Sequence, residues 1–305
     1  WAGSCWYYLR YVDPQNDNAL VDKEKEKYWS PIDLYVGGAE HATRHLIYAR
    51  FWHKFLYDIG VVNYPEPFTR LQNVGLILAE DGRKMSKRWG NVINPDDVVK
   101  EFGADAMRLY EMFMGPFDQP CAWSTNGVIG CRRFLEKVWY LQEKVSDSAG
   151  IASKLVTLIH QTVKKVSEDI PAMRYNTAIA KMMELVNELG KEEKITKENY
   201  LLLIKILSPF APHITEEIWN EMDGQGSVFE SSWPQYDEQL AKDSEITLVV
   251  QINGKMRDSM LVSSDISEDG AKKIALESDV IKKWLEGKEP KKIIYIKGKL
   301  VSIVV

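Results

Sequence analysis

Apolar residues in the first part of the chain form short runs that end where glycine appears. One run, 34–36, is followed by two glycines, and a second run, 74–78, ends shortly before Gly82. A helical pattern of apolar positions follows each run. Strand-length runs that alternate with helical stretches are typical of α/β folds with a parallel sheet. We therefore predict that residues 1–115 form an α/β domain.

From about residue 116 the apolar positions recur with the period of an α-helix. The stretches with this period lie near 127–148, 151–168, 175–189 and 196–222. Gly150 and Gly190 are the expected stops between them. Glycine, serine and proline then accumulate over 223–234, which is typical of a linker. These features predict an all-α helical bundle over 116–240.

The C-terminal part has a third pattern. The strand-like run 246–252 leads into Asn253 and Gly254 and a second run that ends at Val262, which is the pattern of a two-residue β-hairpin. One helical stretch and two further strand-like runs follow near 267–286, 292–296 and 300–305. We predict a small α+β domain over 245–305.

The composition is that of an ordinary globular protein and excludes several classes. The chain has 305 residues, a formal net charge of −5, 45% hydrophobic and 27% charged residues, which excludes collagen-like and wholly disordered proteins. No window approaches the roughly 18 apolar residues of a membrane span, and the N-terminus lacks the order of a signal peptide. Cys5, Cys121 and Cys131 are odd in number and form no Cys-x-x-Cys pair, so neither a disulfide framework nor a cysteine zinc site is expected. These features favour a cytoplasmic protein without a membrane partner.

Charge is unevenly distributed along the chain. Residues 245–305 contain 11 Lys and Arg against 9 Asp and Glu, whereas the rest of the chain is acidic. Five of these lysines lie within 288–299. Such a cluster can face the phosphates of a nucleic acid. A solvated basic edge that deters strand pairing explains the same pattern equally well.

The densest group of charged side chains lies between Gly82 and Gly90, where two arginines and two lysines occupy residues 83–88. Ammonium groups beside a nucleotide triphosphate stabilise the charge that builds up on departing pyrophosphate, and flanking glycines let a loop close over a substrate. A basic loop without such context is usually a solvated turn. From the residues alone, both a phosphate-binding loop and a solvated turn therefore stay open for 82–90.

Several motifs resemble those of the class I aminoacyl-tRNA synthetases. The segments similar to that class are K-M-S-K-R at 84–88, close to its K-M-S-K-S signature, the continuations at 90–95 and 103–110, and S-P-F-A-P-H-I-T-E-E-I-W at 208–219, which resembles the anticodon-binding helical domain of the Met, Val, Ile and Leu enzymes. The segments that most resemble leucyl-tRNA synthetases are 4–8, 33–52 and 250–257. The resemblance extends over essentially the whole chain.

The resemblance implies a Rossmann-type parallel sheet in the catalytic part and a reaction in two steps. The carboxylate of leucine attacks ATP, which binds with Mg²⁺, to give leucyl-adenylate and pyrophosphate. The terminal ribose of tRNA(Leu) then takes the leucyl group. The matching catalytic candidates are Lys87 and Lys84 as stabilisers of pyrophosphate and the transition state, with Ser86 bonded within the loop or to phosphate. Arg88 departs from the family's final serine.

The resemblance also assigns binding residues. The positions that match the ATP site are Gly37, Gly38, Glu40, His41, Met85 and Lys87. The positions that match the leucine pocket are Cys5, Tyr8, His41 and His45. Because His41 and His45 are four positions apart, we expect them on one face of a helix. We expect Glu40 near the start of that helix, where its carboxylate can accept hydrogen bonds from ribose hydroxyls.

Two other interpretations of this histidine pair remain open. The His-x-x-x-His spacing also occurs in zinc sites, but here Ala42 rather than glutamate follows the first histidine, so we expect no protein-bound metal. Alternatively, both histidines belong to the core with their hydrogen bonds satisfied. The aromatic side chains expected to lie in the core nearby are Trp6, Tyr7, Phe51, Trp52 and Phe55.

The helical and C-terminal parts are expected to bind tRNA, mostly through phosphates and shape. The basic candidates are Arg132, Arg133 and Lys137 in the bundle and Lys255, Arg257, Lys291 and Lys292 in the C-terminal part. Each of these residues, taken alone, can equally be a solvated surface charge.

The family's other signature, H-I-G-H, does not occur in the sequence, and neither does a plausible editing insertion. The chain begins at Trp1 inside an aromatic run, which is unusual for a terminus that tolerates fraying. We therefore expect the C-terminal portion of a leucyl enzyme, inactive alone, with the N-terminal catalytic half or subunit as its partner. Two alternatives stay open, a non-catalytic tRNA- or RNA-binding module and the valyl or isoleucyl enzyme of the same class.

Overall fold

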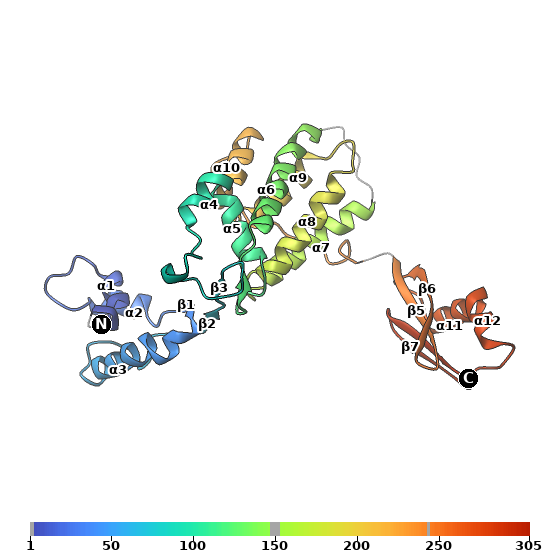
Figure 1. Ribbon diagram of the computed structural model, residues 1–305, viewed down its shortest axis with the longest axis horizontal. Coiled ribbons are helices and arrows are strands. Elements are labelled where there is room, and N and C mark those ends of the chain that lie inside the picture. The colour runs from blue at the N-terminus through green and yellow to red at the C-terminus, as the bar shows by residue number, and fades with distance from the viewer. Residues whose placement is uncertain (1–2, 147–152, 243–244) are drawn as a thin grey trace. The chain divides into compact units, whose positions relative to one another are not determined.

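The computed structural model describes residues 3–146, 153–242 and 245–305 (Figure 1). The chain forms two compact units, one made of residues 1–150 and 165–234 and the other of 151–164 and 235–305. The predicted helix stop at Gly150 and the first residue, Trp1, lie outside the described residues. No helix within the described ranges is both long and apolar enough to cross a membrane.

The first unit begins with an α/β part. Its elements are η1 (Gly3–Cys5), α1 (Tyr7–Val12), α2 (Lys23–Trp29), β1 (Tyr35–Gly38), η2 (Ala39–Thr43), α3 (His45–Asp58), β2 (Leu71–Val74), β3 (Ile77–Leu78), η3 (Lys87–Trp89) and β4 (Cys121–Ala122). The strands form two parallel pairs, β1 with β2 and β3 with β4. Because α3 connects the parallel strands β1 and β2, this part is a truncated Rossmann-like domain, as the sequence predicts.

Helix α3 buries only one of its faces. The inward side chains are His45, Ala49, His53 and Leu56, and Ala49 and Leu56 join a small core with Tyr8, Leu9 and Val62. The four inward positions recur every three or four residues, as expected of a helix that packs on one side. This core fixes α3 and α1 together at the carboxyl end of β1.

The opposite face of α3 is apolar and uncovered in the described chain. The apolar positions on it follow each other at intervals of four, Ile47, Phe51, Phe55 and Ile59. Phe51 is 75% exposed and Phe55 46%. The prediction that the nearby aromatic residues lie in the core is therefore wrong for Tyr7, Phe51, Trp52 and Phe55, all of which are exposed; only Trp6 packs against the small core. The reason is geometric, because a helix with apolar residues on two faces needs a covering element on each side.

The rest of the first unit is helical. Its helices are α4 (Pro95–Phe102), α5 (Ala104–Phe113), α6 (Thr125–Tyr140), η4 (Leu141–Lys144), α8 (Tyr175–Leu189), α9 (Lys197–Leu207), α10 (Pro212–Glu221) and η5 (Val228–Glu230), and α7 (Ser153–Asp169) connects the two units in sequence. The fully buried side chains of this part include Tyr200, Leu203, Ile204, Leu207 and Met182. The predicted helical bundle is confirmed.

Of two predictions about where helices end in the bundle, one is confirmed and one is wrong. Gly190 ends α8 as predicted. The stretch 196–222, predicted as one helical region, is two helices, α9 and α10. The break is due to Pro209 and Pro212, because proline lacks the N–H that a helix interior requires, while Pro212 suits the first turn of α10.

The second unit contains a four-stranded sheet in the order β6-β5-β8-β7. Its elements are β5 (Glu245–Ile252), β6 (Lys255–Ser263), α11 (Glu268–Glu277), α12 (Asp279–Leu285), β7 (Lys292–Ile296) and β8 (Leu300–Val304). Asn253 and Gly254, at φ 51° and 77°, form the predicted hairpin turn between β5 and β6. The predicted helix at 267–286 is two helices, because Ser278 ends α11 and caps α12. Both helices pack on the sheet through a common core, so the predicted α+β fold is confirmed.

Candidate functional site

The best-formed candidate for a small-molecule site is a cavity at the carboxyl end of β1. Its volume is about 400 Å³, and it is lined by Tyr7, Tyr8, Tyr11, Ile32, Leu34, Tyr35, Val36, Gly37, His41 and Phe68. Most of these side chains are aromatic or aliphatic, with few polar groups among them. An apolar cavity with a few polar groups at strand ends is the usual form of a ligand site in α/β proteins.

One polar atom of this cavity lacks a partner. The Nδ1 atom of His41 is buried, and none of the described residues forms a hydrogen bond with it. A buried nitrogen without a partner is unfavourable unless a ligand or water supplies the bond. Of the two predicted histidines, His41 is therefore the one that a ligand in this cavity would contact.

His45 is in a different position. It is 5% exposed and does not line the cavity. Its Nε2–H donates to the carbonyl of Ser4 at 2.7 Å, and its Nδ1 accepts from the Tyr35 hydroxyl at 2.8 Å. Its ring also stacks on Tyr35. Both nitrogens of His45 are therefore engaged within the protein, and the residue holds Tyr35, which lines the cavity, in place.

The expectation that His41 and His45 share one helix face is wrong. His41 lies in the 3₁₀ helix η2, and α3 begins only at His45. Arg44 interrupts the two helices at φ −128° and ψ −98°. The two rings are nevertheless near each other, with centroids 6.4 Å apart. A change of helix type brings the pair together, and the spacing argument fails because it assumes a continuous α-helix.

A histidine that the sequence analysis does not assign supports Tyr8. The Tyr8 hydroxyl donates to Nδ1 of His53 at 2.9 Å, and His53 Nε2–H donates to the carbonyl of Tyr64 at 3.0 Å. Burial lowers the pKa of His53 and raises the pKa of Tyr8, so both are neutral near pH 7. The position of His53, eight residues after His45 on the inward face of α3, was the available sequence signal.

Of the remaining residues predicted near this cavity, some line it and others do not. Gly37 lines it, while the Glu40 carboxylate folds back over Gly38, where any side chain would collide with it. Glu40 is exposed in the first turn of η2. Cys5 is partly buried in η1 and is not among the lining residues. Because the Glu40 carboxylate is the far end of an exposed, flexible side chain, this contact leaves the predicted role of Gly38 untested.

The K-M-S-K-R segment forms an ordered loop after β3. The amide of Ala79 donates to Arg83 O at 2.9 Å across the turn at Gly82. The Ser86 hydroxyl accepts from the amide of Arg88 at 3.2 Å and caps η3. This bond lies within the loop, which is one of the two roles expected for Ser86.

Asn91 fixes the loop from its far side. Its Oδ1 accepts from the amide of Ser86 at 2.9 Å, and its Nδ2 donates to Lys84 O at 3.4 Å. In the sequence Asn91 lies within 90–95, the segment that resembles the continuation of the family's motif. Because both bonds go to the backbone of the loop, Asn91 holds the backbone from which the side chains of Lys84 and Lys87 extend.

The charged side chains of the loop divide into two kinds. Arg83 is paired with Asp81, by bonds of 2.8 and 2.6 Å, and both Arg83 and Arg88 lie over the ring of Trp89. Lys84 and Lys87 are exposed, and no described residue forms an ion pair with either. The loop thus immobilises its arginines and presents its lysines to solvent, where an anionic ligand can reach them.

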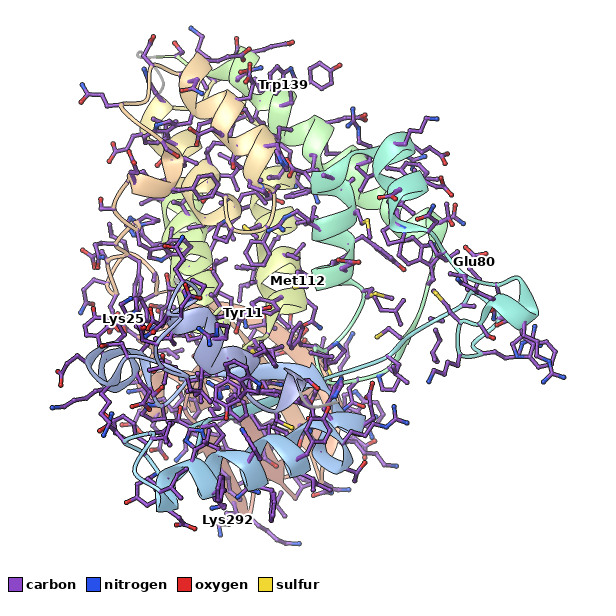
Figure 2. All side chains as sticks on the ribbon, turned by 90° about the vertical axis from the view of Figure 1, so that its left-hand side faces the viewer. Tyr11, Lys25, Glu80, Met112, Trp139 and Lys292 are labelled. Carbon is purple, nitrogen blue, oxygen red and sulfur yellow. The ribbon has the colours of Figure 1, made fainter. Side chains whose placement is uncertain are left out.

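The loop is tied to the helical part at its base. Glu80, labelled beside the loop in Figure 2, accepts from the amide and hydroxyl of Thr125 at 3.1 and 3.0 Å. Thr125 begins α6, where a carboxylate is favoured by the helix dipole. The residues of the loop do not line the 400 Å³ cavity.

The predicted RNA-binding residues lie in both units. In α6, Arg133 is exposed, Arg132 is paired with Glu136, and Lys137 donates to Asn187 at 3.0 Å. In the second unit Lys255, Lys291 and Lys292 are exposed on or beside strands. Arg257 instead stacks on Trp284 at 3.5 Å, so its guanidinium packs on a helix and is only partly exposed. No group of His, Cys, Asp and Glu side chains within the described ranges could hold a metal ion.

Two family models match the chain. The model for tRNA synthetases class I (I, L, M and V) matches residues 14–123, which include the loop and the cavity-lining residues from Ile32 to Phe68 but not Tyr7, Tyr8 and Tyr11. The model for the anticodon-binding domain of tRNA ligase matches residues 153–274.

Solved structures agree with these matches. The chain is similar to agnB2 LeuRS of Agrobacterium radiobacter K84, solved in a ternary complex with tRNA and LeuAMS, with 33% identity and a TM-score of 0.83 over 99% of this chain and 42% of that one. It is also similar in fold to methionyl-tRNA synthetase of Mycobacterium tuberculosis in complex with methionyl-adenylate, with 18% identity and a TM-score of 0.50 over 71% of this chain and 48% of that one. The chain thus spans less than half the length of either protein.

Proposed function

The chain belongs to the class I tRNA synthetases, and we propose that it is part of a leucyl-tRNA synthetase, to which it contributes the phosphate loop, one side of the adenylate pocket and surfaces for tRNA. The observation that carries the proposal is that His41, whose buried Nδ1 has no partner among the described residues, lines an apolar cavity at the end of β1. Leucine as the amino acid is supported by the 33% identical LeuRS neighbour.

The proposed chemistry begins with activation of leucine. A carboxylate oxygen of leucine attacks the α-phosphorus of ATP, which binds with Mg²⁺ as substrate, and the bond to pyrophosphate breaks. Negative charge accumulates on the departing pyrophosphate, and the exposed ammonium groups of Lys87 and Lys84 stabilise it. Gly82 and Gly90, both at positive φ, are the two ends about which the loop can close.

The second step transfers the leucyl group. A ribose hydroxyl at the end of tRNA(Leu) attacks the carbonyl carbon of leucyl-adenylate, and AMP leaves. In this scheme His41 hydrogen-bonds the bound adenylate through Nδ1, Glu40 accepts from ribose hydroxyls, and Tyr8, held by His53, shapes the leucine side. His45 is a positioning residue for this wall, since both of its nitrogens are engaged within the protein.

The proposal includes the remaining part of a synthetase as a partner. The exposed apolar face of α3, with Phe51 and Phe55, is supporting evidence, because contiguous apolar surface of this kind usually marks an interface. The chain spans 42% of the similar LeuRS, so a larger portion of such an enzyme is available to cover that face.

Leucine-dependent ATP–pyrophosphate exchange tests the proposal. We expect no exchange by this chain alone and exchange after it is mixed with a separately produced remaining part of a leucyl enzyme. Valine and isoleucine serve as controls. Exchange that depends on valine or isoleucine instead would contradict the leucine assignment, and RNA binding without any exchange would favour a non-catalytic module.

A further inference from the structure

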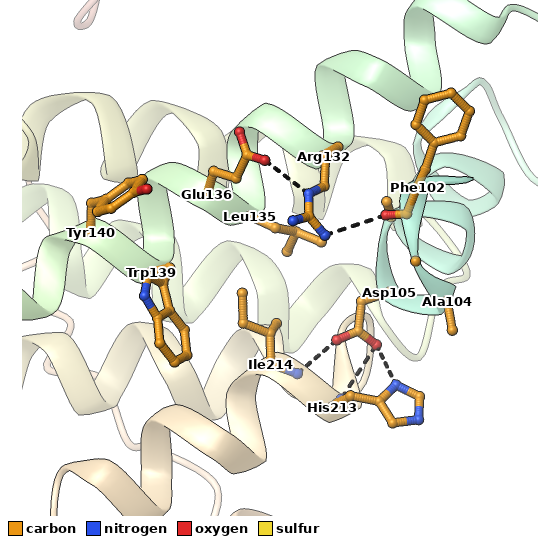
Figure 3. A pocket seen from close by; sticks show the side chains of 12 residues that line it. Phe102, Ala104, Asp105, Arg132, Leu135, Glu136, Trp139, Tyr140, His213 and Ile214 are labelled. Atoms are coloured by element: carbon orange, nitrogen blue, oxygen red, sulfur yellow. Dashed lines mark hydrogen bonds and ion pairs between the residues drawn. The ribbon is translucent and has the colours of Figure 1, made fainter. Parts of the chain in front are cut away.

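A second hollow lies in the helical part and is formed by other elements than the 400 Å³ cavity at the end of β1. Its volume is about 540 Å³, and it lies among α6, the junction of α4 and α5, and the start of α10 (Figure 3). It brings together residues 103–106 and 213–214, which belong to two of the motifs found in the sequence. No step of the proposed reaction uses it.

One end of the hollow is formed by the carboxylate of Asp105, which accepts three hydrogen bonds. Asp105 accepts from the backbone amides of His213 and Ile214 at 3.3 and 2.7 Å, and from His213 Nδ1 at 2.8 Å. The carboxylate thus caps α10, and its charge is offset by three donors. The His213 side chain is 73% exposed, and because Nδ1–H is donated to Asp105, Nε2 is left to bond a ligand.

The rim above this end carries a guanidinium. Arg132 Nε donates to Glu136 at 2.9 Å, and Nη1 donates to the carbonyl of Phe102 at 3.5 Å. The remaining nitrogen, Nη2, has no hydrogen bond to a described residue. Glu136 is therefore neutralised by Arg132, and the polar groups still available at this rim belong to Arg132 and His213.

The rest of the hollow is apolar and aromatic. Leu135 and Ile214 lie between the polar end and the indole of Trp139, as Figure 3 shows. Tyr140 follows Trp139 at the same end and is 60% exposed. A flat ring could stack on Trp139 while its polar edge reaches His213 and Arg132.

The chemistry of the lining restricts the class of ligand. A free phosphate would meet a guanidinium that is already paired with Glu136, and it would gain nothing from Trp139. An aliphatic group would leave the available nitrogens of Arg132 and His213 unsatisfied. A planar ring with hydrogen-bonding atoms at its edge satisfies both ends. Arg133, the next residue on α6, is exposed and does not line the hollow, so it is a candidate for a phosphate contact outside the hollow.

We propose that this hollow holds one unpaired nucleobase of a bound tRNA, stacked on Trp139 with its edge at His213 and Arg132. The proposal rests on the proposed function for its choice of RNA as ligand, and the match of 153–274 to an anticodon-binding domain includes His213 and Ile214. Unpaired bases are recognised by this combination of an aromatic face and polar edge groups.

The test measures the affinity of the full chain for tRNA(Leu) at several salt concentrations. We expect Trp139→Ala to weaken binding roughly five- to hundredfold, the usual worth of one base stack, without changing the salt dependence. Trp139→Phe should retain most of the affinity. Arg133→Ala should instead reduce the slope of log K against log salt by about 1, since it removes a phosphate contact. Trp29→Ala, an exposed tryptophan on α2, is the matched control and should bind normally.

A short single-stranded RNA with one 2-aminopurine provides a second readout. Its fluorescence should be quenched by the wild-type chain and less by Trp139→Ala, and duplex RNA should compete poorly. Normal binding by Trp139→Ala, or equal competition by duplex RNA, would overturn the site. ATP–pyrophosphate exchange needs no tRNA, so the two proposals fail separately. If the mixed enzyme catalyses pyrophosphate exchange but Trp139→Ala binds tRNA normally, only the nucleobase site is wrong. If exchange is absent but Trp139→Ala loses tRNA affinity, only the enzyme assignment is wrong.

Discussion

The helical bundle and the α/β part of the first unit differ in how completely they bury their apolar side chains. In the bundle, Tyr200, Leu203 and Leu207 are fully buried, and the Tyr200 hydroxyl donates to the carbonyl of Val138 at 2.8 Å. In the α/β part, α3 buries one face and leaves Phe51 75% exposed on the other. The bundle therefore buries its apolar residues within the chain, whereas the α/β part leaves an apolar helix face exposed, the face that we propose another portion of a synthetase covers. Substitutions in the two regions should show this difference.

The largest expected effect is on the stability of the bundle. Leu203→Ala removes a side chain that is 0% exposed, and the loss of buried surface together with the cavity should cost about 2 to 5 kcal/mol. Urea unfolding followed by circular dichroism measures the change. A cost below about 1 kcal/mol would show that the bundle core is less tightly packed than the burial indicates.

The loop should affect activity and leave stability unchanged. Lys87→Ala removes an exposed ammonium group without a partner among the described residues, so its unfolding free energy should change by less than about 0.5 kcal/mol. In the assembled enzyme the same change should raise the barrier to leucine activation by about 2 to 4 kcal/mol, by analogy with the loss of one preorganised donor. Pyrophosphate exchange measures it, and Lys100→Ala on α4 is the control. An unaltered rate would contradict the role of Lys87.

Acid should destabilise both regions, through different carboxylates. The hydrogen bond from Lys25 lowers the pKa of Asp13 in the α/β part to about 2. In the bundle, burial opposes ionisation of Asp169, but hydrogen bonds from Lys165, Thr177 and Arg174 outweigh it and lower the pKa of Asp169. A carboxyl whose pKa is lowered by folding stabilises the folded state above its unfolded pKa, near 3.8, and loses that effect as the pH falls.

Hydrogen exchange between pH 5 and pH 2.5 can separate the two contributions. We expect Asp13→Asn to flatten the pH dependence of protection only near α1 and α2, and Asp169→Asn only in the bundle. A flattening of both regions by either substitution would show that they unfold as one cooperative unit.

The exposed face of α3 should contribute little to the stability of the chain alone. Phe51→Ala should change the unfolding free energy of the chain alone by less than about 0.5 kcal/mol, because the side chain is largely in water already. Leu56→Ala, on the buried face of the same helix, should cost about 2 to 5 kcal/mol. If α3 contacts the rest of the synthetase, Phe51→Ala should also weaken the association measured by calorimetry. Strong destabilisation of the chain alone would show that Phe51 already has a covering element.

Local sequence patterns were sufficient for most of the elements. The hairpin at Asn253 and Gly254, the helical bundle and the small α+β domain follow from periodicity and turn residues, because these features depend on neighbours in sequence. The same reasoning failed at 196–222, where two prolines divide the helix, and at His41 and His45, where the 3₁₀ helix η2 changes the direction of the side chains. Both errors come from extending one regular helix across a local break.

The sequence by itself was enough to single out the K-M-S-K-R loop and the histidine pair, because both are recognisable as motifs of residue type and spacing. Only the tertiary structure decided which groups each of these residues contacts. The buried Nδ1 of His41 has no hydrogen-bond partner among the described residues, whereas both ring nitrogens of His45 form hydrogen bonds, to Tyr35 and Ser4. The support of Tyr8 by His53, and the hollow formed by Asp105, Trp139 and His213, join residues far apart in the chain. Such contacts arise from packing between elements, which the order of residues along one element does not record.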